Sequence, residues 1–354
     1  MRTKNFLGIV YVCAIMGAAL LIDCSGKKEE AIDDESYMAM VCSAAEVVRR
    51  DIEPSFPTPK AFSSVVEKAS EELKMSITQS MGPEEVAGLF IKQIYETWGI
   101  GFDSNRTNLY GLFPHTILQR KSGSCLGVSL LFLILAEQTG VPFHGVIIPT
   151  HFFVRFDNDT ARFNLEPNRR GYCYTDKRYR EKYGVAGRPW YTMKNLTREE
   201  VAAALSYNLG NICRIRGLHE KAVVFYAEAL EGLKEFPEAL GNAGISYAYL
   251  GRINDAVTAL RRAKLSDPGL ENISKNLGTM LLRAGRYKDA VQELSEAVGS
   301  RPGDPDLHYS LGVGYYYIED YERALKELSC AITLRPGYSD ARALVRDIKK
   351  EISD

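Results

Sequence analysis

The chain of 354 residues is 45% hydrophobic and 25% charged, a composition typical of globular proteins, and it is long enough for two or three domains. Its formal net charge of −1 gives no electrostatic reason to expect a nucleic-acid partner. The seven cysteines show no paired spacing, which argues against a disulfide framework and against a cysteine-rich zinc site.

The first residues are typical of an export signal. Arg2 and Lys4 precede an uncharged stretch over residues 6–22, which has the length of the apolar region of a signal peptide. This stretch is slightly short for a membrane span. We therefore predict a signal peptide over residues 1–23, which places the body of the protein outside the cytoplasm.

Residues 21–24, with the sequence LIDC, resemble the signal of bacterial lipoproteins, in which the cysteine becomes the lipidated first residue. Asp23 departs from that motif, which prefers a small residue at this place. We expect a lipid anchor at Cys24 that holds the protein in the cell envelope, facing the periplasm or the exterior. A conventional signal peptide and an uncleaved anchor are the alternatives. Residues 24–36 are polar and charged, which predicts a tether between membrane and fold.

The next part of the chain, residues 37–118, has a mostly helical pattern. Helices are predicted over residues 37–51, 62–75 and 83–98, and a loop rich in Asn and Gly follows them. No cluster of residues in this part points to chemistry.

Residues 125–139 are the strongest predicted helix of this region. The segment is apolar nearly all round, which indicates a buried helix. Ser122 or Ser124 can cap its start, and Gly140 ends it. Cys125 then lies in the first turn, where the free N–H groups and the dipole of the helix favour a thiolate.

A β-hairpin is predicted after this helix. Its strands and turn cover residues 146–148, 151–156, 157–160 and 162–166. With the turn centred between Asn158 and Asp159, His151 lies directly opposite Glu166 on one side of the sheet. A carboxylate in that place can fix the tautomer of the imidazole and stabilise the imidazolium. With Cys125, the two residues form a candidate set of nucleophile, base and orienting acid.

Two more polar residues share this face of the hairpin. Arg155 lies four residues along the strand from His151, and Asn164 lies beside Glu166. Either side chain could contact a substrate. A solvated polar face is the alternative, and it is favoured slightly for Arg155.

Three blocks of sequence here resemble the transglutaminase-like superfamily, and within it the bacterial branch related to the SirB1 N-terminal domain. The blocks are GSCLGVSLLFLILAEQTGVPFHG, PTHFFVRF and FNLEPNRRG. The resemblance covers about residues 85–200. It implies an α+β, papain-like domain, assigned to residues 37–200, with a Cys-His-Asp triad and no cofactor.

Carried onto this chain, the resemblance makes Cys125 the nucleophile, His151 the base and Glu166 the orienting acid. Glu166 departs from the more common Asp and is one methylene longer. Gln119 has the spacing before Cys125 of a papain-type oxyanion glutamine, with a surface loop residue as the alternative. A metal site is disfavoured, because Cys125 and His151 lack a second pair of ligands at usable spacing.

A basic and aromatic stretch over residues 172–190 follows the predicted acid. One interpretation is a flap over the site that selects substrates. The other is a solvated connector packed on the first repeat. The sequence favours neither.

The C-terminal part repeats every 34 residues. Small residues recur in three registers, at Gly210, Gly244, Gly278 and Gly312, at Ala222, Ala256, Ala290 and Ala324, and at Ala229, Ala263, Ala297 and Ala331. This pattern resembles the tetratricopeptide repeat, with four helix–turn–helix units over about residues 205–340 and a cap helix over 338–352. We assign residues 201–354 to an all-α repeat solenoid.

Such a solenoid presents a groove for a peptide or protein partner, with a spacer or scaffold as the alternative. For the whole chain we expect a membrane-anchored, extracytoplasmic, transglutaminase-like cysteine hydrolase or acyltransferase that acts on peptide or isopeptide amides. A catalytically inactive scaffold that binds proteins through the repeats is the alternative.

Overall fold

The structure of the chain is a computed structural model that describes residues 36–105 and 107–353. The predicted signal peptide, the lipid anchor at Cys24 and nearly all of the predicted tether lie outside these residues. By its internal contacts the chain divides into two compact units, which are treated separately below. Among the described residues, the N-terminal unit comprises 36–105, 107–186, 191–216 and 231–233, and the repeat unit comprises 187–190, 217–230 and 234–353.

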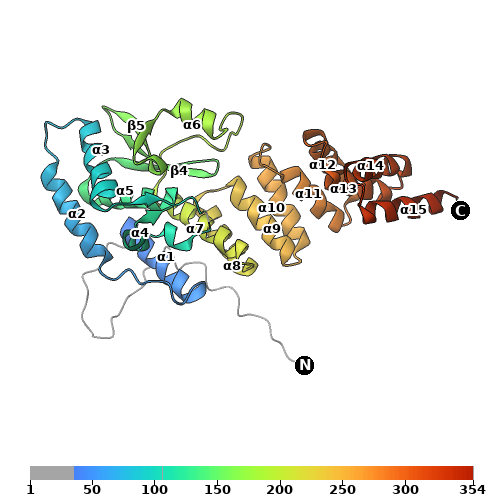
Figure 1. The fold of residues 1–354 in the computed structure, drawn as a ribbon, viewed down its shortest axis with the longest axis horizontal. Helices are drawn as coiled ribbons and strands as arrows, with labels where there is room; N and C mark the ends of the chain where they lie inside the picture. The colour runs from blue at the N-terminus through green and yellow to red at the C-terminus, as the bar shows by residue number, and fades with distance from the viewer. Residues whose placement is uncertain (1–35, 106, 354) are drawn as a thin grey trace, which may run out of the picture. The chain divides into compact units, whose positions relative to one another are not determined.

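The N-terminal unit is a mixed α/β domain with a small sheet (Figure 1). Its helices are α1 (Tyr37–Asp51), α2 (Phe62–Ser76), α3 (Pro83–Ile91), the π-helix η1 (Lys92–Thr97), the 3-10 helix η2 (Leu109–Leu112), α4 (Pro114–Arg120), α5 (Cys125–Thr139), the 3-10 helix η3 (Pro167–Arg169), α6 (Asp176–Lys182) and α7 (Arg198–Ile215). Its strands are β1 (Gly101–Phe102), β2 (Ser122–Gly123), β3 (Phe143–Ile148), β4 (His151–Asp157), β5 (Arg162–Glu166) and β6 (Tyr172–Tyr174). The expected α+β class is confirmed.

The helix α5 spans the predicted residues. Ser124 caps its start by accepting a hydrogen bond from the N–H of Gly127 at 3.2 Å, and Gly140 ends it at a φ of 73°. Its side chains from Leu126 to Ala136 are buried, as the continuous apolar pattern predicts. A Cβ on Gly127 would lie 2.2 Å from the carbonyl oxygen of Gly111, so only glycine lets the preceding loop pass close to the helix start.

The main sheet is antiparallel, with the strand order β3-β4-β5-β6. Strand β4 is its centre, and every residue from His151 to Phe156 is buried. Burial of successive residues means that both faces of this strand are covered, because side chains alternate between the faces. Figure 1 shows α5 alongside β4 and β5 followed by α6. The prediction of a solvated polar face on this hairpin is therefore wrong.

The hairpin turn lies one residue later than predicted. Asp157 pairs with Arg162, so the loop consists of residues 158–161. The Asn158 side chain explains this loop, since its Oδ1 accepts hydrogen bonds from the N–H groups of Thr160 at 3.0 Å and Ala161 at 2.8 Å.

The later turn changes the register of β4 and β5. The predicted pairing, in which His151 lies directly opposite Glu166, is wrong by two residues, because the last paired positions near this end are Val154 and Leu165. A shift of two residues leaves every side chain on its predicted face. His151 and Glu166 are thus diagonal neighbours, within reach of long side chains.

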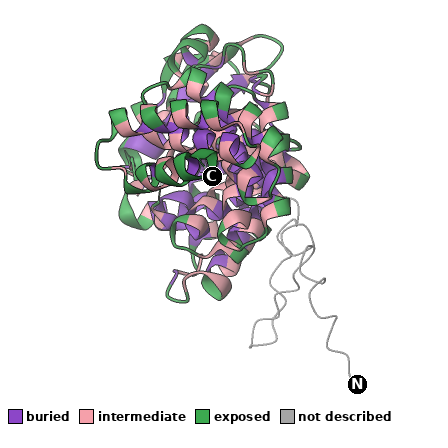
Figure 2. Cartoon of the chain, turned by 90° about the vertical axis from the view of Figure 1, so that its right-hand side faces the viewer, coloured by how far each residue is buried: buried purple, intermediate pink, exposed green. Residues whose placement is uncertain are grey.

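The repeat unit is helical throughout its described elements. These are α8 (His219–Gly232), α9 (Pro237–Tyr249), α10 (Ile253–Ser266), α11 (Ile273–Arg283), α12 (Tyr287–Ser300), α13 (Pro305–Tyr317), α14 (Tyr321–Leu334) and α15 (Ser339–Ser353). Figure 2 shows buried and exposed residues alternating along these helices, as expected when each helix packs by one face. In residues 36–105 and 107–353 no helix combines the length and the apolar character that a membrane crossing requires.

The repeated glycines let paired helices approach closely. A Cβ on Gly278 of α11 would lie 2.6 Å from Leu294 Cγ of α12, and Gly244 and Gly312 lie in the same way against Leu260 and Leu328. These distances are too short for a real side chain, which explains the recurrence of small residues in this register.

We expect Gly278→Ala to destabilise the protein by about 1–3 kcal/mol, because the added methyl overpacks the contact with Leu294. Gly299 of α12 is the matched control, since a Cβ there meets nothing within 4 Å. Gly299→Ala should stabilise the protein by roughly 0.5–1 kcal/mol through helix propensity. Urea unfolding of both variants measures the difference, and equal effects would contradict the close packing at Gly278.

Candidate active site

Cys125 is the first residue of α5, and its side chain is partly exposed. The N–H groups of a first helical turn have no acceptor inside the helix, and the positive end of the helix dipole favours a negative charge there. The position therefore suits a thiolate, as the sequence predicts.

His151 opens strand β4 and connects Cys125 to Glu166. Its imidazole lies close enough to the Cys125 thiol for each group to shift the pKa of the other, and its Nε2 lies 2.9 Å from Glu166 Oε2. The imidazole side chain is 3% exposed and the carboxylate is fully buried. The three residues proposed from the sequence thus lie together, with His151 between Cys125 and Glu166 as the partner of both.

The Glu166 carboxylate reaches His151 although the hairpin register places the two residues diagonally across from each other. The extra methylene of glutamate lets the carboxylate reach the imidazole from a position two residues away from direct opposition. Its second oxygen, Oε1, accepts a hydrogen bond from the N–H of Asn168 at 3.0 Å. The adjoining turn is held by Tyr95 of the π-helix η1, whose hydroxyl donates to the Pro167 carbonyl at 3.0 Å.

The three groups shift each other's pKa values. Burial raises the pKa of the Cys125 thiol, but the hydrogen bond to His151 and its positive charge together lower that pKa below its ordinary value. Burial lowers the pKa of His151, and the hydrogen bonds to Cys125 and Glu166 outweigh it and raise that pKa to about 9. Burial likewise opposes ionisation of Glu166, whereas the bond to His151 keeps its pKa below its ordinary value.

These shifts all favour the same charge state. Below pH 9 the imidazole is protonated, and above the lowered pKa of the thiol the sulfur is ionised. The shifts therefore favour a thiolate, an imidazolium and a carboxylate over the neutral forms of the three groups. This is the state in which a cysteine is a strong nucleophile and a histidine can donate a proton.

Two tyrosines of the basic and aromatic stretch cover the imidazole. The ring of Tyr183 stacks on His151 with centroids 4.6 Å apart and an angle of 1° between the planes. Tyr179 is fully buried and stacks on Phe153 at 3.9 Å. The composition of this stretch suggested a possible flap but singled out neither tyrosine.

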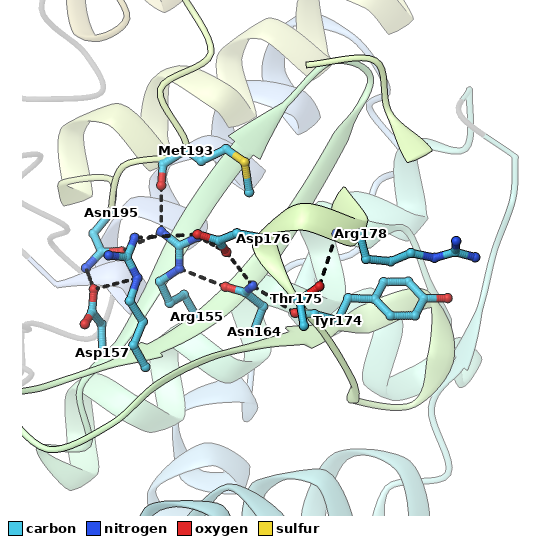
Figure 3. Close-up of polar contacts among 10 residues, drawn as sticks. Arg155, Asp157, Asn164, Tyr174, Thr175, Asp176, Arg178, Met193 and Asn195 are labelled. Carbon is cyan, nitrogen blue, oxygen red and sulfur yellow. Dashed lines mark hydrogen bonds and ion pairs between the residues drawn. The ribbon is translucent and has the colours of Figure 1, made fainter. Parts of the chain in front are cut away.

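Arg155 is fully buried, whereas the sequence predicted that it contacts a substrate or lies on a solvated face. Its polar contacts are drawn in Figure 3. Its Nε donates to Asn164 Oδ1 at 2.8 Å, and its terminal nitrogens donate to the Met193 carbonyl at 2.6 Å and to Asp176 Oδ1 at 2.8 Å. Asn164 is also buried, and its Nδ2 donates to Asp176 Oδ1 at 2.7 Å. Both candidates for substrate contact therefore bind other residues of the domain.

The proposed oxyanion residue Gln119 lies on the exposed side of α4. Gly123, just before α5, lies against Ile117, whose Cδ1 would be 2.7 Å from an added Cβ. The N–H of Cys125 at the helix start is an oxyanion donor that needs no side chain.

Comparison with known proteins finds a family match for each of the two parts of the chain. Residues 60–204 match the family described as transglutaminase-like superfamily, and residues 242–305 match the family described as tetratricopeptide repeat. These matches confirm the resemblance to the transglutaminase-like superfamily and the resemblance to the tetratricopeptide repeat.

Similar proteins include a UPF0162 protein of Xylella fastidiosa, which is 21% identical over 266 residues, covering 71% of this chain and 91% of that protein. F-box only protein 21 of Mus musculus is 40% identical over 58 residues, covering 16% of this chain and 9% of that protein. Among solved structures, MamA from Desulfovibrio magneticus RS-1 has a TM-score of 0.41 and 28% identity, covering 43% of this chain and 86% of that chain. Residues 60–204 of this chain are thus a transglutaminase-like domain, and tetratricopeptide repeats follow it.

Proposed function

We propose that the N-terminal unit is a cysteine hydrolase or acyltransferase that acts on peptide or isopeptide amides. The observation that carries this proposal is the cluster in which His151 lies beside the Cys125 thiol and is hydrogen-bonded to the buried Glu166. A thiolate at a helix start, a protonated imidazole and a carboxylate that orients it are the three groups that nucleophilic acyl transfer requires.

The thiolate of Cys125 attacks the carbonyl carbon of the amide and forms a tetrahedral intermediate. The negative charge on its oxygen is stabilised by the N–H at the start of α5. The His151 imidazolium then gives its proton to the leaving amine, the C–N bond breaks, and a thioester remains.

The thioester is resolved by a second nucleophile. Neutral His151 accepts the proton of a water molecule or of an amine as it attacks, and the thiolate leaves. Water gives hydrolysis and an amine gives acyl transfer. In both outcomes Glu166 keeps its charge and stabilises the imidazolium.

The repeats give this proposal a second part. Tetratricopeptide repeats fit a protein-interaction role, and we assign them the recruitment of a peptide or protein partner. If Cys125 proves unreactive, the chain is instead a binding scaffold that acts through these repeats.

The place of action in this proposal is the cell envelope. The apolar segment over residues 6–22 and the LIDC sequence ending at Cys24 support a lipid anchor there. Proteins or peptides of the envelope are then the substrates within reach.

The central test is the reactivity of Cys125 with iodoacetamide between pH 5 and 10, measured by mass spectrometry of the labelled peptides. We expect fast labelling of Cys125 already at neutral pH, because His151 lowers the pKa of its thiol. The exposed Cys173, whose thiol pKa is raised by burial, serves as the reference inside the same chain. His151→Ala should lower the rate at Cys125 at pH 7 by about tenfold or more. If Cys125 in the unchanged protein reacts no faster than Cys173, the enzyme proposal is wrong.

Removal of the Glu166 charge should shift the pH dependence of Cys125 labelling. In Glu166→Gln the imidazole loses the partner that raises its pKa, so less imidazolium is present to stabilise the thiolate. The midpoint of Cys125 labelling should therefore shift to higher pH by about one unit. Glu96→Gln, an exposed residue of η1, is the control and should leave the midpoint unchanged. An unshifted midpoint in Glu166→Gln would mean that the carboxylate does not act on the thiol.

The membrane anchor is tested by Cys24→Ala. Because the lipid would be attached to this sulfur, the variant should leave the membrane fraction and appear among the soluble proteins after cell fractionation. Cys42→Ala serves as the control, since Cys42 lies on α1 within the folded domain. Intact mass analysis provides the decisive check, because a mature protein that retains residues 1–23 refutes the predicted cleavage.

A further inference from the structure

One face of strand β4 and one face of helix α6 meet in three successive contacts. On β4 the residues are His151, Phe153 and Arg155, which alternate onto one side of the strand. On α6 and its C-terminal cap they are Tyr183, Tyr179 and Asp176, as Figure 3 shows for the Arg155–Asp176 contact. We propose that α6 is a clamp on the imidazole of His151 and that Arg155 and Asp176 anchor it. This inference rests on the proposed function of the site.

The spacing of the three contacts follows from the two elements. Alternate residues of a strand are about 6.6 Å apart, and one helical turn rises about 5.4 Å. Asp176, Tyr179 and Tyr183 are separated by three and then four residues, which places them on one side of a helix. A helix that runs antiparallel to the strand can therefore meet every second residue of it.

The contacts differ in chemistry along this line. At the far end, Arg155 Nη2 lies 2.8 Å from Asp176 Oδ1. In the middle, the rings of Phe153 and Tyr179 stack at 3.9 Å with 9° between their planes. At the site, His151 and Tyr183 stack at 4.6 Å with 1° between their planes.

The helix needs an anchor because it is short. Its seven residues would not remain helical by themselves, since isolated helices below about 12 residues are marginal in water. Thr175 caps its start by accepting a hydrogen bond from the N–H of Arg178 at 3.1 Å. The charge of the fully buried Arg155 then fixes Asp176, the first residue of α6, against the sheet.

The clamp completes the orientation of the imidazole. Glu166 holds the Nε2 atom, but a hydrogen bond at this atom does not by itself fix the plane of the ring. Tyr183 lies flat on the ring and fixes its plane, which keeps the ring in its orientation beside Cys125. The charged and titratable groups around the ring are Cys125, Glu166, Tyr179 and Tyr183, with Lys182 at 5.0 Å from the Tyr183 ring. Tyr183, Arg155 and Asp176 are thus positioning residues.

The test compares four variants in the iodoacetamide titration, with Cys330 of the repeat unit as the internal reference. Tyr183→Leu removes the stacking ring, and Asp176→Asn removes the charge opposite Arg155. Each should lower the labelling rate of Cys125 at pH 7 by about tenfold and move its midpoint to higher pH, because the imidazole no longer holds its orientation. Tyr183→Phe keeps the ring and should stay within about twofold of the unchanged protein.

The fourth variant is the matched control. Glu181→Gln changes an exposed carboxylate on the same helix, away from the three contacts, and should also stay within about twofold. If the unchanged protein labels rapidly and Tyr183→Leu and Asp176→Asn match it, the clamp is refuted while the proposed function stands. If the unchanged protein itself labels slowly, the proposed function fails.

Hydrogen exchange separates the anchor from the chemistry. The N–H groups of Tyr179 and Tyr183 donate within α6, to Thr175 and Tyr179. In Asp176→Asn their exchange should become at least about tenfold faster while the amides of α5 keep their protection, because only α6 loosens. Unchanged exchange of α6 refutes the anchor whatever the labelling shows. If Asp176→Asn loses protection throughout the domain, it has unfolded globally, which contradicts a local anchor. The clamp is then tested on Tyr183→Leu alone: slow labelling of Cys125 with an unchanged thermal unfolding temperature supports the clamp, and labelling at the rate of the unchanged protein refutes it.

Discussion

The buried contact between His151 and Glu166 is the interaction on which the rest of the N-terminal unit depends. A charged imidazole and a carboxylate removed from water are stable only when each is paired and hydrogen-bonded, and loss of one partner leaves an uncompensated charge at a cost of about 3–5 kcal/mol. Each neighbouring element supplies part of this pairing. The turn after β5 gives the N–H of Asn168, and η1 holds that turn through Tyr95. Helix α5 brings the Cys125 thiol close to the same imidazole.

The sheet buries the contact between His151 and Glu166 away from water. Strand β4 is buried on both faces, although its sequence contains a histidine and an arginine. Arg155 is compatible with that burial because Asn164, Met193 and Asp176 all accept its hydrogen bonds. These partners come from three different segments of the chain. A single buried cation therefore joins β5, α6 and the segment before α7 to the strand that carries the imidazole, so the fold and the site share the same side chains.

The sequence predicted what depends on local pattern. The limits of α5, the capping Ser124 and the spacing of the repeat glycines follow from neighbouring residues, and the structure agrees at each. The register of β4 and β5 was not predicted, because turns over residues 157–160 and 158–161 have similar composition. The hydrogen bonds of the Asn158 side chain stabilise the second of them. The set of Cys125, His151 and Glu166 survived the wrong register because an error of two residues preserves the face. The burial of Arg155 and the stacking of Tyr183 could not be predicted from the sequence. Both depend on a short helix, α6, that only the folded domain stabilises.

The energetics of the site bear on the choice between an enzyme and a scaffold. A buried ionic cluster is not an efficient way to stabilise a fold, because apolar residues of similar volume are often as stable or more so. The aromatic rings of Phe153 and Tyr179 already provide well-packed apolar contact on the same face of β4. A domain that served only to hold a solenoid would gain nothing from a thiol at a helix start facing a protonated imidazole. The proposed reaction of the thiolate gives this arrangement a use, which supports the proposal of an enzyme over that of a scaffold.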